Sequence, residues 1–243
     1  MQPDQATRLR LLVSDEASDE VVAQPRASRT LSVVGAKGGV GTSTVALNLA
    51  VALSISGCRV ELATASDLVG EATALTRGPA GVVLLGEEGW RRSLLWQPSL
   101  SHSKQFIPAA SELADWLIVD RGTAPSANDA ESMLLVSTPE PASILAAFEA
   151  LRSAHASGIA AELLVNRAGT LAETERIRVR LTEASRRLLG CCPNVYELPE
   201  DIAVLDAARL GRPVALARPA CPFSRGVQRL VDVWSSARSE RAA

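Results

Sequence analysis

Apolar residues along this chain follow two patterns that alternate from the region of Thr30 onward. Short continuous apolar runs predict buried strands, and apolar residues that recur every three or four positions predict helices. The predicted strands are Leu31–Val34, Val60–Ala63, Val82–Leu85, Trp116–Val119, Met133–Val136, Leu163–Val165 and Val195–Leu198. The predicted helices are Ser43–Ser56, Ala142–His155, Leu171–Leu189, Ile202–Leu210 and Arg225–Arg238. This alternation predicts an α/β fold, a doubly wound and mainly parallel sheet with helices on both faces.

The first part of the chain follows a different pattern. Residues 1–13 predict a short helix, with Asp4 as a candidate N-cap and an apolar stripe at Leu9, Leu12 and Val13. Residues 14–29 are polar and predict a flexible linker, so that the compact domain spans residues 30–243. Residues 86–104 have no clear period, and we interpret them as a surface loop or a short helix.

The composition narrows the class of protein. A chain of 243 residues that is 47% hydrophobic can form one full core. The net charge of −2 disfavours a surface that coats nucleic acid. Because no apolar run reaches about 18 residues, no membrane span is predicted, and the polar N-terminus does not resemble a signal peptide. The four cysteines contain no C-x-x-C pair, so neither zinc nor a disulfide framework is favoured and a cytoplasmic location is expected.

A glycine-rich turn follows the first predicted strand and precedes the first predicted helix. Glycines let backbone N–H groups close around a polyphosphate, and the helix N-terminus adds its positive dipole end. The usual phosphate loop ends in G-K-[ST], where the hydroxyl binds Mg²⁺. Here Gly41 is followed by Thr42 and Ser43, so the hydroxyl is kept and the loop lysine is absent. An ordinary tight turn is the alternative, but three glycines in four positions favour phosphate binding.

Several motifs resemble the MinD/ParA family of P-loop ATPases. The segment Lys37-Gly38-Gly39-Val40-Gly41 is similar to the family's deviant loop, whose early lysine is its signature. Trp116–Asp120 resembles the strand whose carboxylate holds the Mg²⁺ water shell. The remaining matches are Thr138-Pro139-Glu140-Pro141, Val165-Asn166-Arg167, Leu198-Pro199-Glu200-Asp201 and, for the FlhG branch (FleN, YlxH), the D-Q-A-x-x-L-R pattern at Asp4, Gln5, Ala6, Leu9 and Arg10.

The resemblance implies a set of ligand-binding residues. ATP or ADP would be held by Gly38, Gly39, Val40, Gly41, Thr42, Ser43, Thr44, Asn166, Arg167, Pro199 and Asp201. Mg²⁺ would be held by Ser43 and Asp120. The signature lysine, Lys37, would be catalytic, since in the family it reaches the nucleotide of the other subunit in an ATP-dependent homodimer.

The resemblance also implies a function, an ATP-binding regulator of flagellar placement or number. Its partner would be an FlhF-like GTPase, engaged by Asp4, Gln5, Ala6, Leu9 and Arg10. Peripheral contact with the inner face of the plasma membrane stays open. The apolar stripe of the last helix is better explained as a core face than as a membrane anchor.

Three departures from the family weaken the expectation of ATP hydrolysis. Thr42 replaces the loop lysine, and Thr64-Ala65-Ser66 stands where the family has D-x-D; Asp67 lies three residues beyond that position. The interval from there to Asp120 is also shorter than in the family. Because phosphoryl transfer depends on positioning and charge stabilisation, we expect weak or lost hydrolysis. The alternatives are a pseudo-ATPase scaffold of a pilus, secretion or cellulose apparatus and, third, a ParA-type DNA partitioning ATPase.

Overall fold

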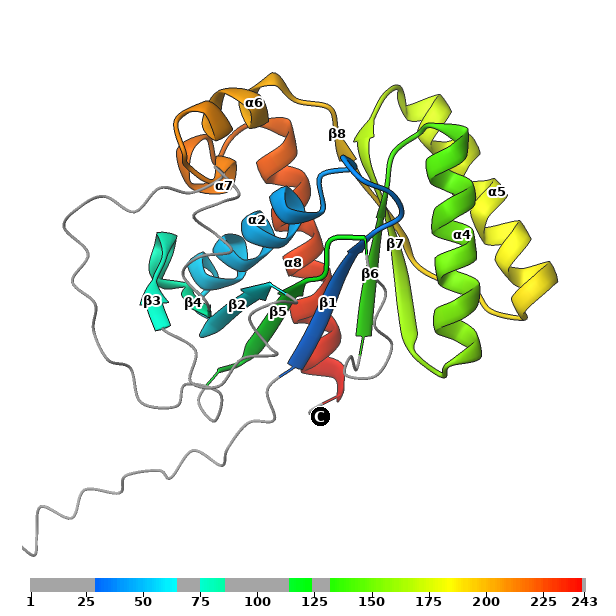
Figure 1. The fold of residues 1–243 in the computed structure, drawn as a ribbon, viewed down its shortest axis with the longest axis horizontal. Helices are drawn as coiled ribbons and strands as arrows, with labels where there is room; N and C mark the ends of the chain where they lie inside the picture. The colour runs from blue at the N-terminus through cyan, green and yellow to red at the C-terminus, as the bar shows by residue number, and fades with distance from the viewer. Residues whose placement is uncertain (1–28, 65–74, 86–113, 124–131, 242–243) are drawn as a thin grey trace, which may run out of the picture.

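The computed structural model describes residues 29–64, 75–85, 114–123 and 132–241. One sheet of eight strands forms the centre, in the order β3-β4-β2-β5-β1-β6-β7-β8 (Figure 1). The strands are β1 (Arg29–Gly35), β2 (Val60–Thr64), β3 (Leu75–Arg77), β4 (Val83–Leu85), β5 (Trp116–Asp120), β6 (Ser132–Ser137), β7 (Ala160–Ala168) and β8 (Val195–Pro199). Seven of them run parallel, and β3 pairs antiparallel with β4. The predicted fold class is confirmed.

Helices cover both faces of the sheet (Figure 1). They are α2 (Thr42–Ile55), α4 (Pro141–Ala156), α5 (Leu171–Leu189), α6 (Ile202–Arg209), α7 (Val214–Ala217) and α8 (Pro222–Arg241), together with the short 3₁₀ helix η1 (Pro79–Gly81). One layer contains α2, α6, α7 and α8, and the other contains α4 and α5. Each layer buries its own apolar cluster against the sheet, as expected for a parallel sheet whose strands are apolar on both faces.

Helix α2 is the central element of the larger cluster. Its residues from Val45 to Leu53 are all buried, between β1, β2 and β5 on one side and α8 on the other. A helix that is apolar all round requires such a position. Because α2 begins directly after the glycine turn, this packing fixes the turn at the carboxyl end of β1.

All seven predicted strands and all five predicted helices are present. Helix α5 has the predicted ends, and every other element differs from the prediction at one or both ends. Strand β7 has nine residues and is longer than predicted. It includes the polar residues Glu162, Asn166 and Arg167, which an apolar run cannot mark. Strand β4 begins one residue late, since the N–H of Val82 closes the η1 turn on the carbonyl of Pro79 at 3.2 Å. Strand β1 begins at Arg29, one residue inside the predicted linker.

Strand β3 and helix α7 were not predicted, because each element is too short to show a recognisable period. Strand β3 has three residues and α7 has four. Helix α7 is held by tertiary contact, since Ala215 donates its N–H to Asn48 Oδ1 of α2 at 2.8 Å. The predicted N-terminal helix, most of the linker and residues 86–104 lie outside the described residues. Within the described part of the chain, no helix combines the length and apolarity needed to cross a bilayer.

Candidate functional site

The glycine turn lies at the carboxyl ends of the central strands, between β1 and α2. Gly41 has a left-handed conformation (φ 92°), and a Cβ on it would approach Asn166 Nδ2 to 2.6 Å. Both the left-handed backbone and the lack of room for a Cβ therefore require glycine at position 41. By contrast, a Cβ on Gly38 or Gly39 would meet nothing within 4 Å. This part of the turn presents its backbone to open space, as a phosphate-binding loop must.

Thr42 replaces the usual loop lysine and points into the protein. It is the first residue of α2 and only 8% exposed. Its Oγ1 lies where a Cβ on Gly35 would collide with it, so the hydroxyl fills the floor of the turn. A threonine in this position packs the turn against β1 but brings no positive charge to it.

Ser43 and Asp120 come from neighbouring parts of the same edge. Ser43 follows Thr42 in the first turn of α2, and Asp120 ends β5, where it stands in register with Val33 of β1. Asp120 is buried, and its Oδ1 accepts the N–H of Gly122 at 3.0 Å. The carbonyl of Gly122 in turn accepts the N–H of Gly35 at 2.6 Å, so the β5 end is tied to the glycine turn.

One hydroxyl and one carboxylate fit the way Mg²⁺ binds beside a nucleotide. Mg²⁺ keeps several waters and takes only one or two protein oxygens, with phosphates supplying others. No group of three or more His, Cys, Asp or Glu side chains suited to a metal occurs among the residues described. The donors at Ser43 and Asp120 thus suit a metal that arrives with phosphates rather than a permanently bound one.

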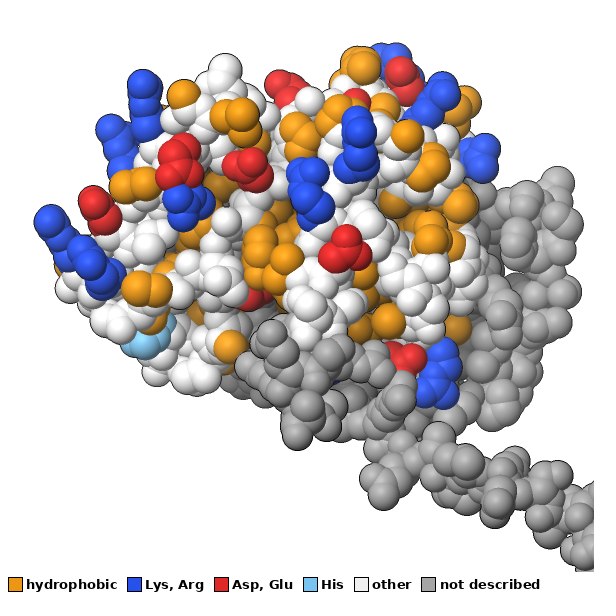
Figure 2. All heavy atoms as spheres, turned by 180° about the vertical axis from the view of Figure 1, so that it is seen from behind, with side chains coloured by type: hydrophobic (Ala, Val, Ile, Leu, Met, Phe, Trp, Pro, Cys, Tyr) orange, Lys and Arg blue, Asp and Glu red, His pale blue; other side chains and the backbone are white. Residues whose placement is uncertain are grey.

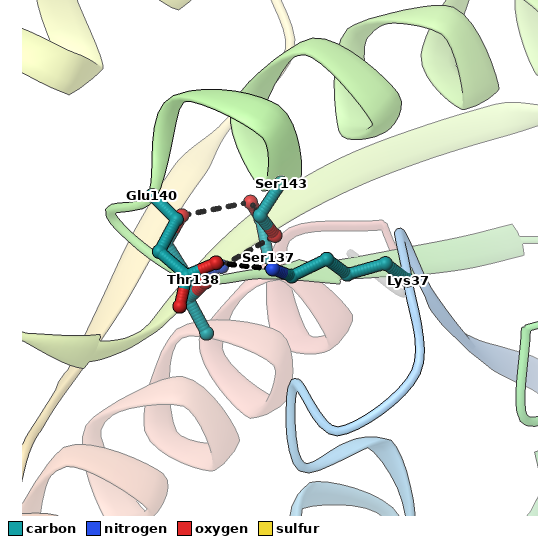
Figure 3. A network of polar contacts seen from close by, with 5 residues as sticks. All are labelled: Lys37, Ser137, Thr138, Glu140 and Ser143. Carbon is teal, nitrogen blue, oxygen red and sulfur yellow. Dashed lines mark hydrogen bonds and ion pairs between the residues drawn. The ribbon is translucent and has the colours of Figure 1, made fainter.

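Lys37 forms an ion pair with Glu140, 103 residues away in the sequence (Figure 3). Glu140 belongs to the turn between β6 and α4, and its pKa is lowered, first by the hydrogen bond from Lys37 and then by the charge of Lys37, with a smaller contribution from Arg167. In this conformation the signature lysine is bound within its own chain.

Hydrogen bonds give the turn that carries Glu140 a fixed shape. The Oγ of the buried Ser143 accepts the N–H of Thr138 at 3.0 Å and lies 3.0 Å from Ser137 Oγ (Figure 3). The N–H of Ser143 is donated to the carbonyl of Glu140 at 2.9 Å. The Thr138-Pro139-Glu140-Pro141 segment singled out in the sequence is therefore a rigid support for the contact with Lys37.

Asn166 connects the end of β7 to the glycine turn. It is 5% exposed, and its Nδ2 donates to the carbonyl of Val40 at 2.8 Å. This hydrogen bond leaves the acceptor Oδ1 for another partner. Arg167 follows with a left-handed conformation (φ 54°) and an exposed side chain. The predicted Asn166 thus has a structural contact with the loop in addition to any contact with a base.

A cavity of about 550 Å³ lies beside the turn. Its lining comes from the start of α2, the end of β7, the loop after β8, and helices α6 and α8: Gly41, Thr44, Asn166, Arg167, Pro199, Glu200, Asp201, Ile202, Val204, Leu205, Ala208 and Phe223. A mostly apolar cavity with a few polar groups is typical of a site for a flat organic ring. The turn and the cavity together have room for the phosphates and the base of one nucleotide.

Asp201 shapes the far wall of this cavity. Its Oδ1 accepts the N–H of Ala203 at 3.0 Å, which caps α6, and its Oδ2 accepts the N–H of Phe223 at 3.1 Å, in the first turn of α8. Partial burial acts to raise the pKa of Asp201, but the hydrogen bonds from Phe223, Ala203 and the Cys221 side chain lower it overall. Asp201 therefore holds two helices at the cavity wall.

The structure brings most of the predicted ligand residues to one edge of the sheet. Gly41, Thr44, Asn166, Arg167, Pro199 and Asp201 line the cavity, and Lys37 to Ser43 form the adjoining turn. Sequence reasoning missed the apolar wall, Ile202, Val204, Leu205, Ala208 and Phe223. The residue pattern held no signal for this wall, because the exposure of Ile202 and Leu205 on α6 is known only from the structure. The predicted partner residues at positions 4–10 lie outside the described residues.

A glycine turn after the central strand of a parallel sheet, with Ser43 and Asp120 beside it, defines the class as a P-loop protein. No family profile matches the chain. The sequence is 28% identical to the antiactivator FleN of Pseudomonas aeruginosa over 246 aligned residues, covering 85% of this chain and 87% of FleN. It is 30% identical to an iron-sulfur cluster carrier protein of Deinococcus radiodurans over 237 residues, covering 81% of this chain and 66% of that protein.

The fold superposes on the septum site-determining protein MinD of Pyrococcus horikoshii, complexed with Mg-ADP, with a TM-score of 0.60. The two sequences are 18% identical, and the match covers 84% of this chain and 94% of that one. The chain is similar in sequence to FleN over most of both proteins, and its fold is that of the solved MinD and ParA-type proteins. The family resemblance seen in the sequence is confirmed.

Proposed function

We propose that this protein is an ATP-binding regulator of flagellar placement or number, which acts through an FlhF-type GTPase and hydrolyses ATP slowly or not at all. The homology to FleN over most of both chains supports the regulatory role. The D-Q-A-x-x-L-R pattern at residues 4–10 supports the GTPase partner. The observation that carries nucleotide binding is the cavity beside the glycine turn, with Asn166 joining the two.

The nucleotide would lie across the turn and the cavity. Backbone N–H groups of the turn and the N-terminus of α2 bind the phosphates, since both direct positive partial charge toward them. The Ser43 hydroxyl and Asp120 hold Mg²⁺, which neutralises part of the phosphate charge when bound. The base enters the cavity against α6, where Asn166 offers its Oδ1 as an acceptor. Relatives of this fold support the ligand, since MinD of Pyrococcus horikoshii binds Mg-ADP.

Slow turnover follows from the charges beside the turn. Thr42 is buried where a lysine would otherwise meet the phosphates, and Lys37 is paired with Glu140. The D-x-D carboxylate that orients water in the family is a threonine at position 64. Phosphoryl transfer needs charge stabilisation and an oriented nucleophile, so binding can persist where hydrolysis fails.

Partner binding in the family suggests a homodimer that forms around the nucleotide. For Lys37 to reach a nucleotide on a second copy, it must first leave Glu140. The side chains of this ion pair are 40% and 63% exposed, so water screens the attraction between them and the exchange is inexpensive. The apolar residues Leu9, Leu12 and Val13 would bind a groove of the GTPase as one face of a short helix.

Two tests separate the parts of this proposal. Calorimetric titration of the purified full chain with Mg-ADP and Mg-ATP tests nucleotide binding, and the absence of heat with both would overturn it. A peptide of residues 1–13 tests the partner, since it should accelerate GTP hydrolysis by the cognate FlhF-type GTPase and Gln5→Ala should weaken the effect. If neither the peptide nor the full chain changes that rate, the GTPase partnership is wrong.

A pseudo-ATPase scaffold of a pilus, secretion or cellulose apparatus is the second candidate. The buried Thr42 favours it, because a scaffold needs no hydrolytic cycle. The same GTPase assay distinguishes the two, since a scaffold would leave the GTPase rate unchanged. DNA partitioning is disfavoured by the net charge of −2. On the face seen in Figure 2, Lys and Arg side chains are interspersed with Asp and Glu.

An iron-sulfur carrier role is also disfavoured. Iron-sulfur clusters are held by cysteine thiolates, often in a C-x₂-C spacing. The four cysteines here are Cys58, Cys191, Cys192 and Cys221, none of which has that spacing. The likeness to the Deinococcus protein therefore reflects the shared P-loop domain rather than a cluster site.

A further inference from the structure

Arg167 has a distinct position in the cavity. Of the twelve described residues that line it, Arg167 is the single cation. The acids Glu200 and Asp201 line the same cavity, and the N–H of Glu200 donates to the carbonyl of Ala168, the residue after Arg167, at 3.1 Å. Gly41 and Thr44 border the cavity on the side of the glycine turn.

The backbone of Arg167 is strained. Its φ of 54° lies in the left-handed region, which is less favourable for a residue with a Cβ than for glycine. It lies in a bulge, because β7 advances from Val165 to Ala168 while β8 advances only from Glu197 to Pro199. Bulges beside binding sites re-aim side chains. A glycine would hold this conformation at lower cost, so the arginine side chain has a use that offsets the strain.

The residue that precedes Arg167 contacts the glycine turn. The preceding Asn166 is fixed by its 2.8 Å hydrogen bond to the carbonyl of Val40 in the turn. On the other side, the charge of Arg167 acts on Glu140, which is itself bound to Lys37 of the turn. The charge of Arg167 therefore acts on a residue that is bound to the glycine turn.

The phosphate loop itself is short of cations. Thr42 is buried and neutral at the place of the loop lysine, and Lys37 is engaged by Glu140. We propose that Arg167 supplies the positive charge that binds the phosphates of a nucleoside di- or triphosphate, in place of the missing loop lysine. This inference rests on the nucleotide binding proposed above, and it assigns the phosphate contact to a residue outside the loop. Arginine suits the role because its planar fork pairs with phosphate oxygens.

Arg167→Gly tests the inference because it should affect stability and phosphate affinity in opposite directions. Relief of strain should leave the melting temperature of the full chain unchanged or higher, whereas loss of the cation should weaken Mg-ADP and Mg-ATP binding about tenfold or more. Adenosine, measured by competition with a fluorescent nucleotide, should bind the variant within twofold of the wild type. Arg167→Lys should retain part of the phosphate affinity, because it keeps the charge and loses the fork.

Two matched controls fix the interpretation. Ala80→Gly relieves a similar left-handed residue (φ 56°) in η1, far along the chain, and should raise stability without changing affinity. Arg209→Ala removes an exposed arginine of α6 that pairs with Asp206 at 3.5 Å and does not line the cavity. It should leave nucleotide affinity unchanged.

The outcomes separate this inference from the proposed function. If the wild type binds no nucleotide, both are overturned. If the wild type binds and Arg167→Gly binds Mg-ADP equally well, the inference alone is overturned. An equal loss for adenosine and Mg-ADP would assign Arg167 to the base and would also overturn it. A tenfold selective loss of phosphate-bearing ligands, with stability kept, would support it.

Discussion

The two ends of the proposed nucleotide site differ in how completely they are built. At the base end, Asn166 is hydrogen-bonded to the turn and Asp201 fixes two helices around an apolar cavity. At the phosphate end, the turn has its glycines and Ser43 but no cation that is free to bind phosphate. Thr42, at the position of the usual lysine, is neutral and buried, and Lys37 is paired with Glu140. Recognition of a ligand and chemistry on it are therefore separable within one loop and its neighbours.

This difference follows from what each end needs. A base is bound by shape, apolar contact and a few hydrogen bonds, all of which a rigid wall supplies. Phosphate hydrolysis needs positive charge that is correctly placed in the transition state. On the proposed function, the protein would respond to nucleotide binding more than to nucleotide hydrolysis.

The largest effect is expected in the rate of hydrolysis. Loss of a transition-state contact costs about 10²–10³ in rate, so the full chain should release phosphate from ATP far more slowly than a lysine-bearing relative measured beside it. Steady-state phosphate release with Mg-ATP checks this. Release as fast as in the relative, abolished by Asp120→Asn, would show that the phosphate end is catalytically complete.

A smaller effect, a loss of nucleotide affinity, should follow when the contact between Asn166 and the glycine turn is disturbed. Gly41→Ala places a Cβ at 2.6 Å from Asn166 Nδ2, so it should disrupt the hydrogen bond to Val40 and weaken Mg-ADP binding about tenfold or more. Gly57→Ala is the control, because Gly57 has a similar φ of 87° with nothing within 4 Å. Both variants should lose about 1 kcal/mol of stability from backbone strain. Equal nucleotide affinity in the two variants would contradict the role of Asn166.

Restoring a cation should repair part of the phosphate end. Thr42→Lys should tighten Mg-ATP binding about tenfold, because a positive charge then meets the phosphates in a site partly shielded from water. Hydrolysis should return only in part unless Thr64→Asp is added. Titration of labelled nucleotide against both variants measures this effect. An unchanged affinity in Thr42→Lys would mean that position 42 does not correspond to the loop lysine.

The smallest effect concerns the acid stability of the base end. The pKa of Asp201 is lower in the folded protein than its ordinary value of 3.8, so its ionised form stabilises the fold. That stabilisation is complete above the ordinary pKa and is lost as the pH falls through the lowered one. Asp201→Asn should therefore flatten the decline in melting temperature below about pH 5. Glu183→Gln, on the exposed face of α5, is the control, and equal profiles in the two variants would contradict the prediction.

The sequence predicts best where local signals agree. Both ends of α5 match the prediction, because the Thr170 hydroxyl caps its start and Gly190 ends it in a left-handed conformation. The glycine turn and Asp120 were located because a strand, a turn and a helix follow one another with typical residues at each junction.

Contacts between distant segments could not be predicted in this way. The pairing of Lys37 with Glu140 joins residues 103 positions apart, and Phe223 enters the cavity wall only because α8 begins beside Asp201. The buried orientation of Thr42 depends on the absence of a side chain at Gly35. These contacts arise from the packing of the whole sheet. A local pattern of residues carries no information about that packing.

The double attachment at Asp201 limits which residues can replace it. Serine and threonine start helices as well as aspartate does, but each has one side-chain oxygen. Either could accept the N–H of Ala203, and the N–H of Phe223 would then lack its partner. A screen of all substitutions at position 201 should therefore divide by the number of acceptor oxygens rather than by helix-capping preference, and only a carboxylate should be tolerated.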